Sequence, residues 1–173
     1  MFQDITTLLL DPVAYKHCCD MLVERYVGHS LDVVAGFEAR SVNSHAVART
    51  LPLTLLRSGF FFGPTIALAL GLPFVPLRKP RKLPGAVLSE SYQLEYGSDS
   101  LEMHVGAVQP GQRVLLVDDL IATGGTLAAG ARLVRRAGGV PIEACCVVEL
   151  PELGGRAKLE GLEVFTLIEV EGE

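Results

Sequence analysis

The chain has 173 residues, of which 49% are hydrophobic, so it holds enough apolar material for one domain with a core. Its formal net charge of −5 argues against a general attraction to nucleic acid or to an anionic membrane surface. It contains no apolar run of about 18 residues and no signal-peptide pattern, so we expect a soluble, cytoplasmic protein. The four cysteines form the adjacent pairs Cys18–Cys19 and Cys145–Cys146, and we expect reduced, mostly buried thiols.

The first half of the chain predicts helices that alternate with buried strands. Asp11 followed by Pro12 is typical of a helix start, because the carboxylate can cap backbone N–H groups and proline suits the first turn. Residues 32–37 (DVVAGF), which are apolar after Asp32, predict a buried strand. Gly63-Pro64 predicts the start of a second helix, and residues 74–77 predict the next strand.

Two stretches after residue 77 suit a lid over an anionic ligand. Residues 78–85 (RKPRKLPG) hold four cations with prolines and a glycine, which disfavours a place in the core and suits a mobile basic loop. The alternative is a solvated loop without function, which we disfavour because the protein is acidic and the loop follows a predicted strand. Residues 91–97 (SYQLEYG) alternate polar and apolar side chains, which predicts one strand of a lid hairpin.

Residues 113–126, RVLLVDDLIATGGT, form the most informative stretch. Val114–Val117 predicts a strand buried on both faces of a parallel sheet. Asp118 and Asp119 follow where this strand should end, and a Gly/Thr turn at residues 122–126 then opens a helical pattern. In open α/β sheets, ligands bind beyond the carboxyl ends of the strands. The backbone N–H groups and hydroxyls of such a turn, with the positive end of its helix, suit a phosphate.

The two acids distinguish this turn from a triphosphate-binding loop. A Walker A loop requires GxxxxGK[ST], whose lysine neutralises the triphosphate, and no lysine follows Gly125. Paired carboxylates would repel a bare polyphosphate, but they can accept hydrogen bonds from sugar hydroxyls or hold a sugar through Mg²⁺. We therefore interpret the turn as a cradle for a sugar phosphate. The alternative is a generic strand–helix turn with an acidic cap.

The end of the chain predicts scaffold without visible chemistry. Residues 142–148 predict a central strand with Cys145 and Cys146 on opposite faces. Residues 153–159 predict a short helix, and residues 164–168 predict an edge strand. Strands and helices alternate along the whole chain, which favours a parallel α/β fold.

The order of these motifs carries a family resemblance. VLLVDDLIATGGT resembles the phosphoribosyl-pyrophosphate (PRPP) motif of type I phosphoribosyltransferases, and AGFEAR, GFFFGP, RKPRKLPG and SYQLEYG together resemble the adenine phosphoribosyltransferase family. The resemblance implies a single domain over residues 1–173 with the type I fold: an α/β parallel sheet, helices on both faces, a small hood and a mobile lid at residues 79–104. It implies purine salvage, in which adenine and PRPP give AMP and pyrophosphate. It also implies a homodimer, and Mg²⁺ held mainly through the substrate.

The resemblance further implies roles for individual residues. Arg40 and Arg78 would stabilise the leaving pyrophosphate, and Glu95 would be the acid/base group near the adenine N7 or N9 proton. Phe2 would stack on the base and Leu120 would pack against it. The alternatives are an exposed hairpin glutamate for Glu95 and a frayed terminal side chain for Phe2. PRPP or AMP would be bound by the acids, the turn and the lid, that is by Asp118, Asp119, Ala122, Thr123, Gly124, Gly125, Thr126, Lys79, Lys82 and Tyr96.

Residues 41–58 depart from the family pattern. Without them Arg40 would join Gly59 and restore AGFEARGFFFGP, so they interrupt the loop expected to bind pyrophosphate. This insertion is either an excursion that leaves the site working or the product of a retained intron or gene-model error, and the clean junctions favour the second. By the same resemblance, we expect a segment that helps to enclose the base in the family to be absent ahead of Phe2.

Three functions stay open on this reasoning. The first is a working adenine phosphoribosyltransferase, and the second is a binding module that holds AMP or PRPP with little turnover. The third is a nonenzymatic sensor that uses the same pocket. The sequence contains no helix-turn-helix or other DNA-binding element, which makes the sensor the least favoured.

Overall fold

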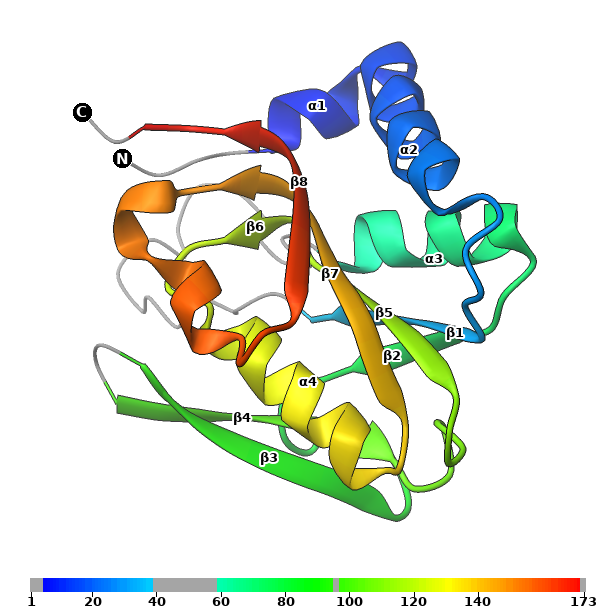
Figure 1. Cartoon of the computed structure of the whole chain (residues 1–173), viewed down its shortest axis with the longest axis vertical. Coiled ribbons are helices and arrows are strands. Elements are labelled where there is room, and N and C mark those ends of the chain that lie inside the picture. The colour runs from blue at the N-terminus through cyan, green and yellow to red at the C-terminus, as the bar shows by residue number, and fades with distance from the viewer. Residues whose placement is uncertain (1–4, 39–58, 95–96, 172–173) are drawn as a thin grey trace, which may run out of the picture.

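A six-stranded sheet runs through the centre of the computed structural model, which describes residues 5–38, 59–94 and 97–171 (Figure 1). The strand order is β2-β1-β5-β7-β6, with β8 beside β7, and the pairings among these described strands are parallel. The predicted parallel α/β fold is therefore confirmed. The strands are β1 (Val33–Phe37), β2 (Phe74–Leu77), β5 (Arg113–Val117), β6 (Leu120–Ile121), β7 (Val140–Glu149) and β8 (Glu163–Glu169).

Helices cover both faces of the sheet (Figure 1). Leu22 of α2 and Ile66 of α3 pack with Cys145 on one face, whereas Leu127 of α4 packs with Cys146 on the other. The predicted opposite orientation of these two cysteines is confirmed, and all four cysteines are buried free thiols. No described helix is long and apolar enough to cross a lipid bilayer. The helices are α1 (Thr6–Leu10), α2 (Pro12–Tyr26), α3 (Gly59–Leu70) and α4 (Gly125–Arg136).

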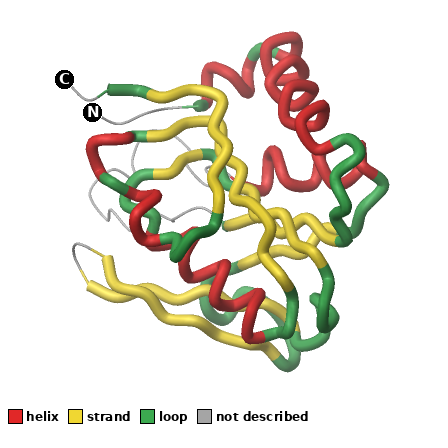
Figure 2. The backbone as a smooth tube through the Cα atoms, viewed as in Figure 1, coloured by secondary structure: helices red, strands yellow, loops and turns green. Residues whose placement is uncertain are grey.

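A separate antiparallel hairpin, β3 (Val87–Leu94) and β4 (Gly97–His104), lies on the outer side of α4. Helix α4 contacts both the hairpin and the sheet, so it lies between them (Figure 2). Glu90 of β3 forms ion pairs with Arg132 (2.7 Å) and Arg136 (2.8 Å) of α4. The prediction of one strand over residues 91–97 is correct only as far as Leu94, where β3 ends, because Gly97 already belongs to the antiparallel strand β4 and residues 95–96 lie outside the described residues.

Two predicted helices differ from those observed. Helix α3 begins at Gly59 rather than at Gly63-Pro64, because the fully buried Phe62 lies one helical turn before Ile66 and extends the apolar face. Residues 153–159 form two short 3₁₀ turns, η1 (Pro151–Leu153) and η2 (Gly155–Lys158), instead of one helix. Gly154 separates these turns with a left-handed backbone (φ 61°), which a continuous right-handed helix cannot contain.

The N-terminal helix start is confirmed in detail. The Asp11 carboxylate accepts hydrogen bonds from the backbone N–H groups of Val13 (2.9 Å) and Ala14 (3.1 Å), and Pro12 occupies the first helical position. These contacts satisfy two of the N–H groups that a helix start leaves without an internal partner. Local chemistry that the sequence displays therefore determines where α2 begins.

Candidate active site

The carboxyl ends of three neighbouring strands bring charged residues to one edge of the sheet. β1, β2 and β5 run parallel, so their carboxyl ends lie on the same side. Glu38, Arg78 and Asp118 directly follow the last residues of these strands. This edge is where ligands bind in open α/β sheets, and it is where the acidic motif and the basic loop were both predicted to lie.

The acid pair is held between two short strand segments by the backbone of β7. The Asp118 N–H donates to the Cys145 carbonyl (3.0 Å), and the Asp119 carbonyl accepts from the N–H groups of Val147 (3.0 Å) and Val148 (2.9 Å). β5 ends before the pair and β6 begins after it, so both acids lie in an interruption along one edge of β7. Their positions are therefore set by the sheet rather than by a free loop.

Burial makes Asp118 electrostatically unusual. Asp118 is only 8% exposed, and its Oδ1 accepts the backbone N–H of Asp119 (3.0 Å). Desolvation first, and the charge of Asp119 second, raise the pKa of Asp118 well above its usual range, while the charge of Lys79 opposes the shift. A cation or a set of hydroxyl donors at this edge would relieve the cost of the charge. The site therefore suits a sugar, alone or with a metal ion.

The Gly/Thr turn places the start of α4 at the same edge. Gly124 precedes the helix in a left-handed conformation (φ 73°), and α4 begins at Gly125. The first N–H groups of a helix lack internal partners and carry the positive end of its dipole. Ala122, Thr123 and Thr126 are half-buried, so part of the turn stays accessible. These features suit a phosphate group, as the sequence predicted.

The hairpin lies directly beside the turn. A Cβ added at Gly125 would lie 3.5 Å from the Gln93 carbonyl oxygen and 3.5 Å from the Tyr92 ring. β3 ends at Leu94, so this contact involves the end of the hairpin that leads into residues 95–96. The hairpin therefore lies against the start of α4, and its role as part of a lid stays a prediction.

Two of the predicted phosphate-binding cations already have acidic partners. Arg78 donates to both carboxylate oxygens of Glu38 (3.1 and 3.2 Å), and Glu38 is only 6% exposed. Lys79 donates to the Tyr92 hydroxyl (2.8 Å) and forms an ion pair with Asp99. These pairs hold both cations at the carboxyl ends of the strands. A bound pyrophosphate would compete with the carboxylates for them.

Sequence reasoning missed the acidic and aromatic partners of these cations. Glu38 carried a weak signal, because it directly follows the predicted strand that ends at residue 37. Asp99 and Tyr92 carried none, because their contacts with Lys79 depend on the fold of the hairpin.

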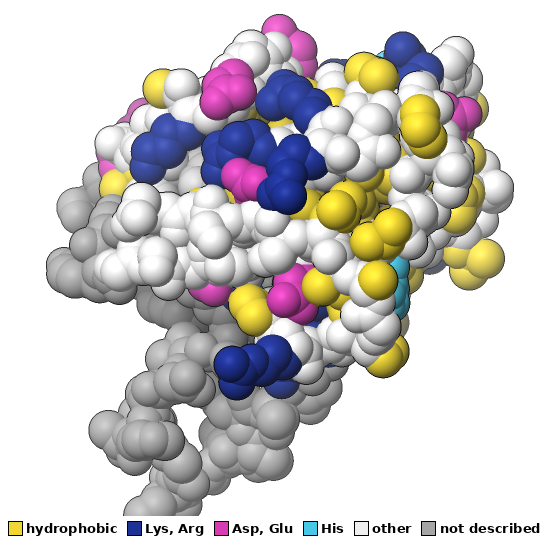
Figure 3. Space-filling model, turned by 90° about the horizontal axis from the view of Figure 1, so that it is seen from below, with side chains coloured by type: hydrophobic (Ala, Val, Ile, Leu, Met, Phe, Trp, Pro, Cys, Tyr) yellow, Lys and Arg dark blue, Asp and Glu magenta, His cyan; other side chains and the backbone are white. Residues whose placement is uncertain are grey.

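The face shown in Figure 3 has Lys and Arg side chains beside Asp and Glu side chains, so the charges on it partly offset one another.

Several predicted site residues are not placed with the rest. Phe2, Arg40, Glu95 and Tyr96 lie outside the described residues, as does the segment 41–58. Lys82 is exposed; its N–H donates to the Lys79 carbonyl (3.3 Å) and its carbonyl accepts from Arg78 (3.0 Å). Leu120 is half-buried against the core on the α2 and α3 face, and its contact with a base stays a prediction. Among residues 5–38, 59–94 and 97–171, no cluster of three or more His, Cys, Asp or Glu could hold a metal.

The fold and this edge define a class of protein. A parallel sheet, an acid pair at a strand end, a lysine-free Gly/Thr turn at a helix start and a neighbouring basic loop are features of proteins that bind phosphorylated sugars. In agreement, residues 29–170 match the model of the phosphoribosyl transferase domain family.

Individual relatives narrow the class. The chain is 56% identical over 171 residues to adenine phosphoribosyltransferase 1 of Triticum aestivum, a match that covers 99% of this chain and 84% of the relative. The crystal structure of adenine phosphoribosyltransferase from Thermoanaerobacter pseudethanolicus superposes with a TM-score of 0.84 at 44% identity, covering 98% of this chain and 88% of that one. The chain therefore belongs to the adenine phosphoribosyltransferases, as its motifs predicted.

A third relative has ligands in its crystal structure. The Trypanosoma brucei adenine phosphoribosyl transferase, in complex with AMP, pyrophosphate and ribose-5-phosphate, has a TM-score of 0.81 at 27% identity. The match covers 97% of this chain and 69% of the trypanosomal chain.

Proposed function

We propose that this protein transfers the phosphoribosyl group of PRPP to adenine and releases AMP and pyrophosphate in purine salvage. The observation that carries the proposal is the adjacent acids Asp118, which is buried, and Asp119, which is half-buried, followed by a Gly/Thr turn, at the same sheet edge as the basic residues Arg78 and Lys79. Membership of the adenine phosphoribosyltransferases supports the choice of base. The ligands of the trypanosomal neighbour are the two products and a phosphoribosyl fragment, which supports the choice of reaction.

The turn at residues 122–126 would bind the 5′-phosphate. Its backbone N–H groups and the hydroxyls of Thr123 and Thr126 can donate to phosphate oxygens, and the positive end of α4 adds a favourable field. The phosphate takes no part in bond breaking. Binding it orients the sugar, so that C1 faces the base and the reaction gains from proximity.

The acid pair would bind the ribose. Carboxylates accept hydrogen bonds from the two ring hydroxyls, and their negative charge stabilises the positive charge that builds on the ring as the C1–pyrophosphate bond breaks. The raised pKa of Asp118 means that its charged form is costly in the free protein. That cost decreases when a positive charge develops nearby, so the pair favours the transition state over the empty site.

The basic loop would stabilise the leaving group. Arg78, Lys79 and Lys82 can donate to pyrophosphate oxygens as negative charge accumulates there, and the proposal includes Arg40 in the same role. Mg²⁺ held mainly through PRPP would supply further charge neutralisation, and the paired carboxylates suit a substrate that carries a cation. Closure of the hairpin over the turn would exclude water, which competes with adenine as nucleophile.

The remaining roles concern the base. Glu95 would handle the N7 or N9 proton of adenine, Tyr96 would close the lid, and Phe2 and Leu120 would pack on the ring. A cytoplasmic homodimer completes the proposal.

A coupled assay for PRPP-dependent AMP formation tests the proposal. We expect activity that requires Mg²⁺ and is lost in Asp118→Ala/Asp119→Ala. The same assay on a chain without residues 41–58 identifies the effect of the insertion. If the shortened chain is active and the full chain only binds AMP, the full chain is a binding protein with little turnover. If neither chain makes AMP or binds Mg–PRPP, the proposed function is wrong.

A further inference from the structure

The backbone of the Gly/Thr turn at residues 122–126, called the phosphate turn from here on, packs against the 3₁₀ turn η2. A Cβ added at Gly155 would lie 2.2 Å from the Ala122 carbonyl oxygen and 3.0 Å from the Gly124 nitrogen. A Cβ at Gly124 would lie 2.1 Å from the Gly155 carbonyl oxygen. Real Cβ atoms do not approach backbone so closely, so the two backbones fit together because both positions are glycine. The position of the turn therefore depends on the position of η2.

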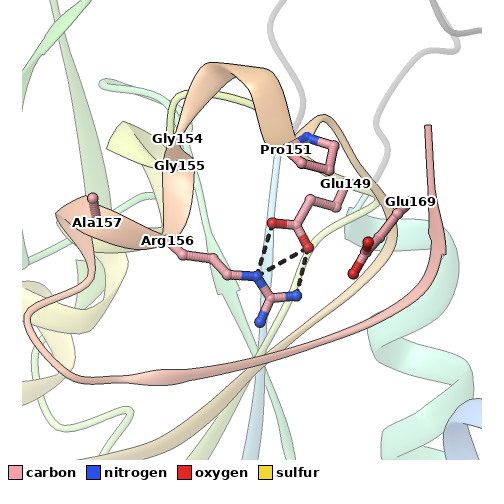
Figure 4. Close-up of a pocket in the computed structure, with 7 residues that line it drawn as sticks. All are labelled: Glu149, Pro151, Gly154, Gly155, Arg156, Ala157 and Glu169. Atoms are coloured by element: carbon pink, nitrogen blue, oxygen red, sulfur yellow. Dashed lines mark hydrogen bonds and ion pairs between the residues drawn. The ribbon is translucent and has the colours of Figure 1, made fainter. Parts of the chain in front are cut away.

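Arg156 anchors η2 to the sheet. Its Nε donates to both carboxylate oxygens of Glu149 (2.8 and 3.0 Å), and its Nη1 donates to the Val164 carbonyl of β8 (2.7 Å). Figure 4 shows the guanidinium against the Glu149 carboxylate, with Gly154 and Gly155 in the adjoining turn. The Thr166 hydroxyl also donates to Glu149 (3.3 Å). A guanidinium held by several oxygens in fixed directions restrains the backbone that carries it.

Glu149 connects this anchor back to the active site. It is the last residue of β7 and is only 4% exposed. In the parallel pairing of β6 with β7 it lies opposite Ile121, the residue directly before the turn. The Leu150 N–H donates to the Ile121 carbonyl (3.0 Å). The contacts therefore form a ring. The turn contacts Gly155, Arg156 forms an ion pair with Glu149, and Glu149 lies opposite Ile121 of β6, which leads back into the turn.

The simpler explanation is that this ion pair only stabilises the C-terminal part of the fold. β7 offers a direct comparison, because Arg25 makes a similar two-oxygen contact with Glu143 of the same strand (2.5 and 3.1 Å), and the Tyr26 hydroxyl also donates to Glu143 (2.6 Å). Arginine hydrogen bonds lower the pKa of both glutamates, so both pairs are charged at neutral pH. The Arg25 pair joins α2 to β7, and in the part of the chain that the structure describes no hydrogen bond or ion pair connects it to the turn.

We propose that Arg156 and Glu149 are positioning residues that act through Gly155 to hold the phosphate turn in its binding geometry. They contact neither the sugar phosphate nor the base in this role. The inference rests on the proposed binding of phosphoribosyl ligands at residues 122–126. It goes beyond that proposal because it assigns a functional effect to the tail of the chain, where the sequence predicted scaffold alone.

The test compares Arg156→Lys and Glu149→Gln with the matched variants Arg25→Lys and Glu143→Gln. For the first two we expect the KM for PRPP to rise about ten-fold, because a small misplacement of the turn weakens the grip on the phosphate. The KM for adenine should stay unchanged. The Arg25 and Glu143 variants should alter neither KM. Equal effects of the two sets, or a parallel rise of both KM values, would overturn the inference.

A second readout does not require activity. Hydrogen exchange of the backbone amides at residues 122–126, measured on the full chain without ligand, should be faster in Arg156→Lys than in wild type and Arg25→Lys. Unchanged exchange in Arg156→Lys would refute the positioning role of Arg156 and Glu149 even in an active enzyme. Faster exchange in a protein that binds no PRPP or AMP would support this positioning role and refute the proposed function, so the two failures are distinguishable.

Discussion

Substituting Gly124 by alanine tests the close contact between the phosphate turn and η2. Gly124 has φ 73°, and the added Cβ would lie 2.1 Å from the Gly155 carbonyl oxygen. Ordinary contact begins at 3.4 Å, so the two backbones must separate by about 1.3 Å. Both are backbone groups, and a rotamer change cannot relieve the overlap.

The cost has two parts. A left-handed backbone costs alanine about 1–2 kcal/mol, and forcing an extra methyl group into a packed site costs about 1–3 kcal/mol. We therefore expect Gly124→Ala to lower the free energy of unfolding by about 2–5 kcal/mol. Since a misplacement of about 1 Å can reduce catalysis a hundred-fold, the kcat/KM for PRPP should fall by about that factor.

Gly28→Ala is the matched control for this substitution. Gly28 also has a left-handed backbone (φ 81°), but an added Cβ there would meet no atom within 4 Å. It should lose only the conformational part, about 1–2 kcal/mol, and retain full activity. Urea unfolding of both variants measures the stability terms, and AMP formation at varied PRPP measures the activity. Equal stability losses in the two variants, together with an unchanged kcat/KM for Gly124→Ala, would refute the close contact.

Three further predictions follow from the charges. Asp118→Asn should raise the free energy of unfolding at neutral pH by about 1–3 kcal/mol while abolishing activity, because it removes a costly buried charge. Its gain should shrink as the pH falls through the raised pKa of Asp118, since the protonated acid is also neutral; a gain that grows in acid contradicts this. Lys79→Met should raise the KM for PRPP about ten-fold and leave that for adenine unchanged, and a rise in the adenine value alone would argue against its role. Arg132, more than Arg136, lowers the pKa of Glu90, so this carboxylate stabilises the fold at neutral pH and the contribution is lost as the pH falls through the lowered pKa. Glu90→Gln should therefore cost about 1 kcal/mol in urea unfolding at neutral pH and nothing in acid, and an undiminished cost in acid would exclude the ion pair as its source.

Local sequence patterns predicted most of the fold. The strand at residues 74–77 matches β2, and the predicted cap at Asp11 is the observed one, because short apolar runs and helix-capping residues act over a few positions. The start of α3 was missed because the helix begins ahead of Pro64. Phe62 before the proline and Ile66 after it share one apolar face, and only their packing in the core makes the residues before the proline helical.

The candidate site was predicted where its residues are consecutive. The acid pair and the Gly/Thr turn lie in one stretch, so the motif alone located them. The pairing of Glu38 with Arg78 joins residues that are 40 positions apart, and the contact of Gly155 with Gly124 joins two backbones. No side-chain pattern encodes such contacts, so the buried partners of the cations and the support of the turn emerged only from the fold.

Calorimetric titration of the full chain with AMP and with Mg–PRPP tests most directly whether residues 118–126 hold a phosphorylated ribose. Saturable uptake of both ligands by the folded wild type, abolished in a folded Asp118→Ala/Asp119→Ala variant, is the expected result. Uptake of neither ligand by the wild type, or undiminished uptake by the variant, would contradict it.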